Sequence, residues 1–191
     1  MVSEKQFRQR AGSDLRQIGD QVLALATDRD IYRRLEQEII QHNAQLNDMR
    51  SAVLDMIRGC YAEAMAGRVL RLLDPDGPLS LPRVLSSLAH YPHLLHDKIS
   101  EHEFNQDRAA LELARRNLSS TMVPHIAHHE RTLPALAALH CKLDAAIDLL
   151  INAVKTYYWI VAESYIDLDV RYSEDPLAVF QFAWLVPALA T

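Results

Sequence analysis

The spacing of the apolar residues is the feature that most restricts what this chain can fold into. From Pro134 to about Tyr165, aliphatic side chains recur every three or four positions, at Leu136, Leu139, Leu143, Ile147, Leu150 and Val154. This spacing places them on one side of an α-helix, whereas a half-buried strand needs alternation with period two. No stretch of the chain alternates with period two for long enough to indicate a sheet. The sequence therefore predicts an all-α protein.

A second long helix is expected from Asp28 to about Leu73. Apolar residues, or residues that a buried helix face tolerates, again recur every three or four positions there. They are Ile31, Leu35, Ile39, His42, Leu46, Met49, Val53, Met56, Cys60, Gly67 and Leu70. Asp28 is a suitable N-cap residue, and the sequence DPDGP at 74–78 would end the helix. We expect a bundle of two long antiparallel helices with shorter helices at their flanks.

The shorter helices are predicted from caps and prolines. A weaker helix should run from Ser3 to Leu25, with Phe7, Leu15, Ile18, Val22 and Leu25 on one side. Further helices are expected at 80–90, with Pro82 in the first turn, and from about Leu94 or Asp97 to Ser119, in one or two pieces. The His-rich stretch 123–133 is expected to be an irregular connection or a bent helix start. We divide the chain into a bundle, 1–172, and an apolar C-terminal helix, 173–191, that packs on the bundle or on a dimer partner.

Composition and charge narrow the function classes. Two cysteines exclude a disulfide framework, and Cys60 is expected to be a small core residue. The net charge of −5 argues against a surface that coats nucleic acid, although it permits a local basic cleft. The N-terminus has no apolar segment of the signal-peptide kind, and the longest apolar stretch, 177–190, is too short to span a membrane. We expect a cytoplasmic protein with no membrane partner.

Nine histidines raise the question of a metal site. The pairs His93/His96 and His125/His128 have the i, i+3 spacing that lets two ligands share a metal on one helix. A di-iron bundle needs a carboxylate three residues before a histidine, and no Glu or Asp occupies that position here. The chain also has no glycine-rich phosphate loop and no Gly-x-Ser-x-Gly elbow. We therefore expect no metal and no other cofactor, and a His-bound metal protein is the third-ranked hypothesis.

The segment 115–131 holds the densest polar chemistry of the chain. Arg115, Arg116 and Asn117 lead into His125, His128 and a further histidine. An arginine can stabilise an anionic phosphate, and a histidine can transfer protons near neutral pH. The alternative interpretation is a helix end with an exposed arginine and histidines on the following loop.

Two stretches carry a resemblance to a known family. The sequence AEAMAGRVLRLLD at 62–74, followed by LSLPRVL at 79–85, resembles HEPN-superfamily proteins of the abortive-infection AbiU type. Members of that branch tend to show a long helix that ends in a hydrophobic-Asp step and then a Ser-Leu-x-x-Leu-Leu helix. They next show an Arg-Asn/Asp-Lys-x-x-Ala-His element, whose end is matched by Ile126-Ala127-His128. The resemblance covers roughly residues 15–160.

The resemblance implies a helical bundle that forms homodimers in a defence or toxin–antitoxin system, with a partner such as an antitoxin. Active members are metal-independent ribonucleases, in which an Arg and a His four to six residues apart face a cleft between two chains. Carried over to this sequence, the catalytic residues would be Arg116, His125 or His128, with Asn117 positioning the phosphate or the histidine. The spacing departs from the pattern, because eight residues separate Arg116 from His125 and eleven separate it from His128.

Two hypotheses therefore lead. The first is a HEPN-like defence or toxin–antitoxin protein that cleaves RNA through a divergent Arg/His site, or a relative whose site has decayed. The second is a non-enzymatic dimeric bundle that binds a partner protein or a nucleotide. On one continuous helix, positions nine apart lie on opposite sides and about 13 Å apart along the axis. Arg116 and His125 can therefore meet within one chain only if the chain bends, and Pro124 is the expected place for the bend.

Overall fold

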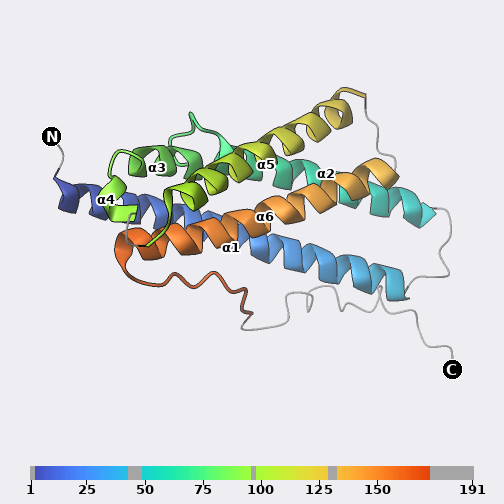
Figure 1. The fold of residues 1–191 in the computed structure, drawn as a ribbon. Coiled ribbons are helices and arrows are strands. Elements are labelled where there is room, and N and C mark those ends of the chain that lie inside the picture. The colour runs from blue at the N-terminus through green and yellow to red at the C-terminus, as the bar shows by residue number, and fades with distance from the viewer. Residues whose placement is uncertain (1–2, 43–48, 96–97, 129–132, 173–191) are drawn as a thin grey trace.

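The computed structural model describes residues 3–42, 49–95, 98–128 and 133–172, and the side chains of 38–54 and 123–134 lie outside this description. Six helices form the described parts: α1 (Glu4–His42), α2 (Met49–Leu73), α3 (Leu81–Leu88), α4 (Pro92–Leu95), α5 (Glu101–His128) and α6 (Leu133–Ala162). In Figure 1, α1 and α5 run in one direction along the bundle, while α2 and α6 run in the other. No strand occurs among the described residues, so the predicted all-α helical bundle is confirmed.

Helix α6 is the centre of the bundle, as its apolar spacing predicts. All six residues of the predicted stripe, from Leu136 to Val154, are buried. Around them α6 packs against α1, α5 and α2. Because Leu15, Ile18 and Val22 of α1 are also fully buried, the predicted apolar side of the first helix is confirmed as well.

The boundaries of the first two helices differ from the prediction. We expected one helix to end at Leu25 and another to run from Asp28 to Leu73, but α1 continues without a break from Glu4 to His42. Asp28 is not an N-cap, because it lies inside α1 and its carboxylate forms an ion pair with Arg68 of α2. Helix α1 ends at His42 and α2 begins at Met49, and residues 43–48 between them lie outside the described residues.

The predicted stripe of α2 is also wrong in part. Met56 is half exposed and Cys60 is exposed, so Cys60 is not a core residue. The buried side of α2 is instead formed by Ala62, Met65, Ala66, Val69, Leu72 and Leu73. Small alanine side chains let neighbouring helices approach closely, and this close approach decides which side of α2 faces inward.

The turn after α2 and the start of α3 agree with the prediction. The amide of Asp76 donates to Asp74 Oδ1 at 3.1 Å, and the amide of Gly77 donates to the Asp74 carbonyl at 3.0 Å. Ser80 is then buried in the N-cap position of α3, with Pro82 in the first turn. This turn returns the chain so that α3 packs on α1, α2 and α5.

Helix α5 is longer than predicted. It was expected to end near Ser119 and to be followed by an irregular or bent segment from Val123, but it continues through Pro124 to His128. Pro124 lacks the amide that would donate to the Ser120 carbonyl, so α5 loses one hydrogen bond there and goes on. The bend that we expected at Pro124 does not interrupt the helix.

After α6 the chain turns back along the bundle as an extended strap, which we define as residues 163–172 (Figure 1). Glu163 adopts a left-handed conformation with φ 53°, and its carboxylate accepts hydrogen bonds from Arg8 and Lys98. The strap passes over Gly19 of α1, where an added Cβ would lie only 2.5 Å from Ile166 Cδ1. Residues 173–191, with the predicted C-terminal helix, lie outside the described residues, and none of the described helices is long and apolar enough to cross a membrane.

Candidate functional site

The predicted arginine of the ribonuclease site lies on the surface of α5. Arg116 keeps 71% of its side chain exposed and forms an ion pair with Glu112 at 2.7 Å. Arg115 contacts the same carboxylate at 2.8 Å. Hydrogen bonds from Arg115 and then from Arg116 lower the pKa of Glu112 to about 2. Arg116 is thus accessible to a phosphate, but a neighbouring carboxylate occupies its guanidinium.

The other predicted catalytic residues follow along the same helix. Asn117 is exposed, and its backbone carbonyl accepts hydrogen bonds from the hydroxyls of Ser120 and Thr121 at 3.0 and 2.8 Å. The backbones of His125 and His128 belong to α5, whereas their side chains lie outside the description. Because α5 is continuous, Arg116 and His125 belong to opposite sides of it, about 13 Å apart along the axis. Within α5 the structure therefore does not bring Arg116 together with His125, and the role of these four residues stays a prediction.

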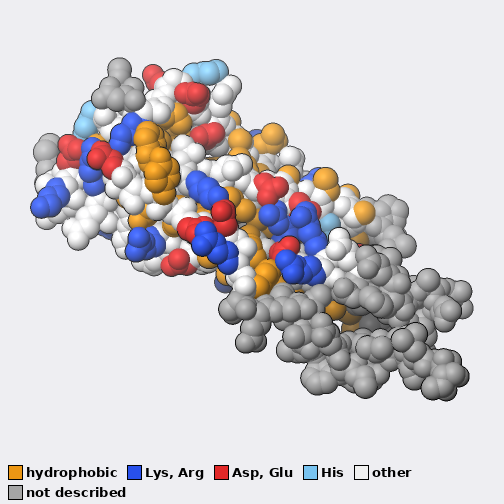
Figure 2. Space-filling model, turned by 90° about the horizontal axis from the view of Figure 1, so that it is seen from below, with side chains coloured by type: hydrophobic (Ala, Val, Ile, Leu, Met, Phe, Trp, Pro, Cys, Tyr) orange, Lys and Arg blue, Asp and Glu red, His pale blue; other side chains and the backbone are white. Residues whose placement is uncertain are grey.

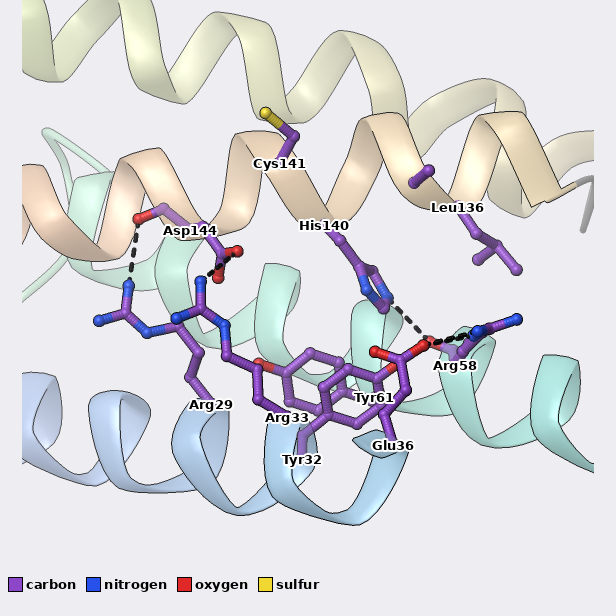
Figure 3. A pocket seen from close by; sticks show the side chains of 11 residues that line it. Arg29, Tyr32, Arg33, Glu36, Arg58, Tyr61, Leu136, His140, Cys141 and Asp144 are labelled. Atoms are coloured by element: carbon purple, nitrogen blue, oxygen red, sulfur yellow. Dashed lines mark hydrogen bonds and ion pairs between the residues drawn. The ribbon is translucent and has the colours of Figure 1, made fainter. Parts of the chain in front are cut away.

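A cavity of about 660 Å³ lies between α1, α2 and α6, and none of the catalytic residues predicted from the sequence lines it. Figure 3 shows its lining side chains, which are Arg29, Tyr32, Arg33, Glu36, Arg58, Tyr61, Leu136, Ala137, His140, Cys141 and Asp144. The four residues from α1 follow the spacing i, i+3, i+4, i+7 and therefore form one stripe of that helix. This stripe was a signal that the sequence contained, because the helix predicted from Asp28 to Leu73 already included all four residues.

Three aromatic rings pack together in this cavity. Tyr32 and Tyr61 stack with ring centroids 3.8 Å apart and an angle of 8° between their planes. His140 of α6 meets both rings edge-on, at 5.2 Å from Tyr32 and 5.5 Å from Tyr61. The three rings join α1, α2 and α6 at one point, so the cavity has a rigid aromatic side.

Ion pairs form the rest of the cavity. Arg58 of α2 contacts Glu36 at 2.7 Å, and Arg33 contacts Asp144 at the same distance. Arg29 contacts Asp148 at 2.7 Å and also donates to the backbone carbonyl of Asp144 at 3.3 Å. The arginines on α1 and α2 thus meet acidic groups of α1 and α6, which links the helices through paired charges rather than apolar contacts.

The tyrosine hydroxyls of the cavity are held in their neutral form. Tyr32 is only 7% exposed, and its hydroxyl has no hydrogen-bond partner. Burial, and then the nearby charge of Glu36, raises the pKa of Tyr32 to about 12. Burial, followed by the charge of Asp144, also raises the pKa of Tyr61. Tyr32 therefore presents a buried, protonated hydroxyl that makes no hydrogen bond of ordinary geometry, although Glu36 and Arg58 lie beside it.

The histidines of the sequence-derived metal hypothesis do not form a described ligand set. His93 is exposed and contacts Glu4 at 3.2 Å, whereas His96 lies outside the described residues. Over the part of the chain that the structure describes, no three His, Cys, Asp or Glu side chains form a group that could hold a metal ion.

Charged side chains of both signs lie on one face of the bundle (Figure 2). On the face seen in Figure 2, basic and acidic side chains are intermingled and do not separate into a surface of one sign. This mixture agrees with the net charge of −5 and with the ion pairs along α1. Nucleic acid binds best to a concentration of positive charge, which this face does not offer.

Comparison of the chain with protein-family models, with curated proteins and with solved structures finds no match.

Proposed function

We propose that this chain is a HEPN-like defence protein of the AbiU type that cleaves RNA, without a metal, at a divergent Arg/His site formed between two copies of the chain. The observation that carries the proposal is the continuity of α5. Arg116 and His125 belong to one helix but to opposite sides of it, so an active site that uses both needs a second copy to supply one of them. The resemblance in α2 and α3 supports the same family.

The chemistry needs only an arginine and a histidine. The 2′-hydroxyl of RNA attacks the adjacent phosphate, a histidine from His125 or His128 moves the protons, and Arg116 stabilises the developing charge. Asn117 follows Arg116 on the exposed surface of α5 and would position the phosphate or the histidine. Exposed ion pairs contribute little stability, so an RNA phosphate can replace Glu112 as the partner of Arg116.

A mixing experiment tests whether the site lies between two chains. The variant Arg116→Ala and the double variant His125→Ala/His128→Ala should each fail to cleave RNA. When the two variants are co-expressed, half of the dimers contain one of each, and one of the two sites in such a dimer is intact. Activity should then return to about one quarter of the wild-type rate, because statistical pairing leaves that share of sites complete.

The matched control is Arg115→Ala, which removes the neighbouring arginine from the same Glu112 and should leave cleavage nearly unchanged. Cleavage should also persist in excess chelator, since the proposed mechanism uses no metal. Full activity of either variant alone would show that the residues are wrong. A monomer in light scattering, or a wild-type protein that leaves a broad panel of RNAs uncut, would instead favour the non-enzymatic binding module.

A further inference from the structure

Two arginines of α1 converge on one residue of α6 in the cavity between α1, α2 and α6 (Figure 3). Arg33 donates to Asp144 Oδ2 at 2.7 Å, and Arg29, one turn earlier, donates to the Asp144 carbonyl at 3.3 Å. Guanidinium groups placed in this way can together bind an anion with several oxygens, and phosphate is the anion that arginine forks fit best. The Asp144 carboxylate therefore lies where an anionic ligand would be held.

The Asp144 carboxylate can be displaced. Arg33 and Asp144 keep 52% and 33% of their side chains exposed, whereas Arg29 keeps only 14% and its partner Asp148 keeps 60%. The exposed Arg33–Asp144 pair adds little to stability, so opening it costs the fold little. A phosphate monoester carries more charge than a carboxylate and offers more acceptor oxygens, so it can compete for both arginines.

The rest of the cavity suits a planar ring. Its volume of about 660 Å³ lies in the range of small-molecule sites. Tyr61 and His140, both half-buried, line it on the aromatic side. The hydroxyl of Tyr32 is buried without a partner, and a buried donor in this state lowers stability until an acceptor reaches it. The cavity therefore combines an anion subsite with an aromatic side and an unused donor.

We infer that this cavity binds a phosphorylated small molecule with a heteroaromatic ring, the chemistry of a nucleoside monophosphate. Its phosphate takes the place of the Asp144 carboxylate at Arg33 and of the Asp148 carboxylate at Arg29, and its ring lies beside Tyr61 and His140. Asp144 then acts as an internal competitor that sets the affinity. The inference is independent of the ribonuclease proposal, since none of the residues involved belongs to the Arg116 site.

Isothermal titration calorimetry of the full chain with AMP, and separately with inorganic phosphate, tests the inference. AMP should bind more tightly than phosphate because of its ring. Asp144→Asn should tighten AMP binding about fivefold, since it removes both the competitor and its negative charge. Arg33→Ala should weaken AMP binding about tenfold. Arg34→Ala is the matched control, because Arg34 pairs with Asp30 on the same helix but does not line the cavity, and it should leave binding unchanged.

A second measurement does not depend on the variants. In NMR spectra of the wild-type protein, AMP should shift the ring signals of His140 and leave those of the exposed His90 in place. An absence of AMP binding at millimolar concentration would overturn the inference, as would Asp144→Asn binding no more tightly than wild type. Equal loss of affinity in Arg33→Ala and Arg34→Ala would show binding to surface charge in general and would overturn it too.

Discussion

The two halves of the bundle are built from the same helices in different ways. In the apolar half, α1 up to Ala26 and α6 from Leu150 onward bury leucine, isoleucine and valine against each other. In the polar half, which contains the cavity, α1 buries only Tyr32 among its described side chains beyond Ala26, and ion pairs take the place of apolar contacts. Apolar burial supplies most of the free energy of folding, whereas exposed ion pairs supply little.

The polar half is the part of this fold in which substitutions can change function at a small cost in stability. Residues of the apolar half are fixed by close packing, so a substitution there is paid for in stability. The charged residues of the polar half touch solvent and hold one another, so they can exchange partners with a ligand at small cost. The same helices thus provide a stable frame at one end and an adaptable surface at the other.

The largest expected effect tests the contrast directly. Leu150→Ala removes a fully buried side chain of α6 and should lower the free energy of unfolding by about 2 to 5 kcal/mol. Arg33→Ala, in the polar half, should lower it by less than about 1 kcal/mol, because the Arg33 side chain is half exposed. Urea unfolding followed by circular dichroism measures both values. Similar losses in the two variants would abolish the distinction between the halves.

Alkaline pH should affect the polar half first. Burial raises the pKa values of Tyr32, Tyr61 and Tyr157, and Tyr32, at about 12, is the group expected to ionise first among the three. Since unfolded tyrosine has a pKa near 10, the stability from these shifts is fully present below about pH 10 and is lost as pH rises through the folded values. In the folded protein, part of the phenolate absorbance at 295 nm should appear only well above pH 10. In urea, the absorbance should rise in a single step near pH 10. A single step near pH 10 in both would contradict this prediction.

Removing one tyrosine hydroxyl should change the free energy of unfolding in opposite directions in the two halves. Tyr157 donates to Asp107 Oδ2 at 2.7 Å, so Tyr157→Phe should lower the free energy of unfolding by about 2 kcal/mol. The hydroxyl of Tyr32 has no partner, so Tyr32→Phe should raise that free energy by about 1 kcal/mol. Thermal unfolding of the two variants, each with one hydroxyl removed from a stacked or edge-packed ring, gives the comparison. A loss of stability in Tyr32→Phe would mean that its hydroxyl is bonded after all.

Local patterns predicted the parts of the fold that local physics decides. The stripe of α6, the turn at 74–78 and the start of α3 at Leu81 depend on residues close in sequence, and the structure confirms them. The ends of α1 and the buried side of α2 depend on contacts between helices. Asp28 resembles an N-cap in the sequence, but it lies inside α1, where its carboxylate pairs with Arg68, forty positions away.

The cavity could not be predicted from the sequence, for a related reason. Its arginines, tyrosines and His140 come from three helices, and no short motif joins them. The predicted Arg/His site, in contrast, was read from a single stretch, and the structure shows that this stretch is one helix. Sequence reasoning predicted residues of α5 for this site, and whether a second copy of the chain completes it depends on contacts that no stretch of one chain encodes.

The pairing of α1 with α6 has a consequence for how the chain is made. The hydrogen bonds that α1 makes with α6 and with Glu163 just after it join residues far apart along the sequence. The separations are 155 positions for Arg8 and Glu163, 142 for Arg16 and Tyr158, and 111 for Arg33 and Asp144. Domains generally fold during synthesis from the N-terminus, and distant contacts slow folding. On the ribosome, α2 and α3 can cover part of the apolar side of α1 early, but the part that packs on α6 stays uncovered until α6 emerges. During that interval the nascent chain is exposed to aggregation and depends on chaperones more than a bundle with neighbouring partners would.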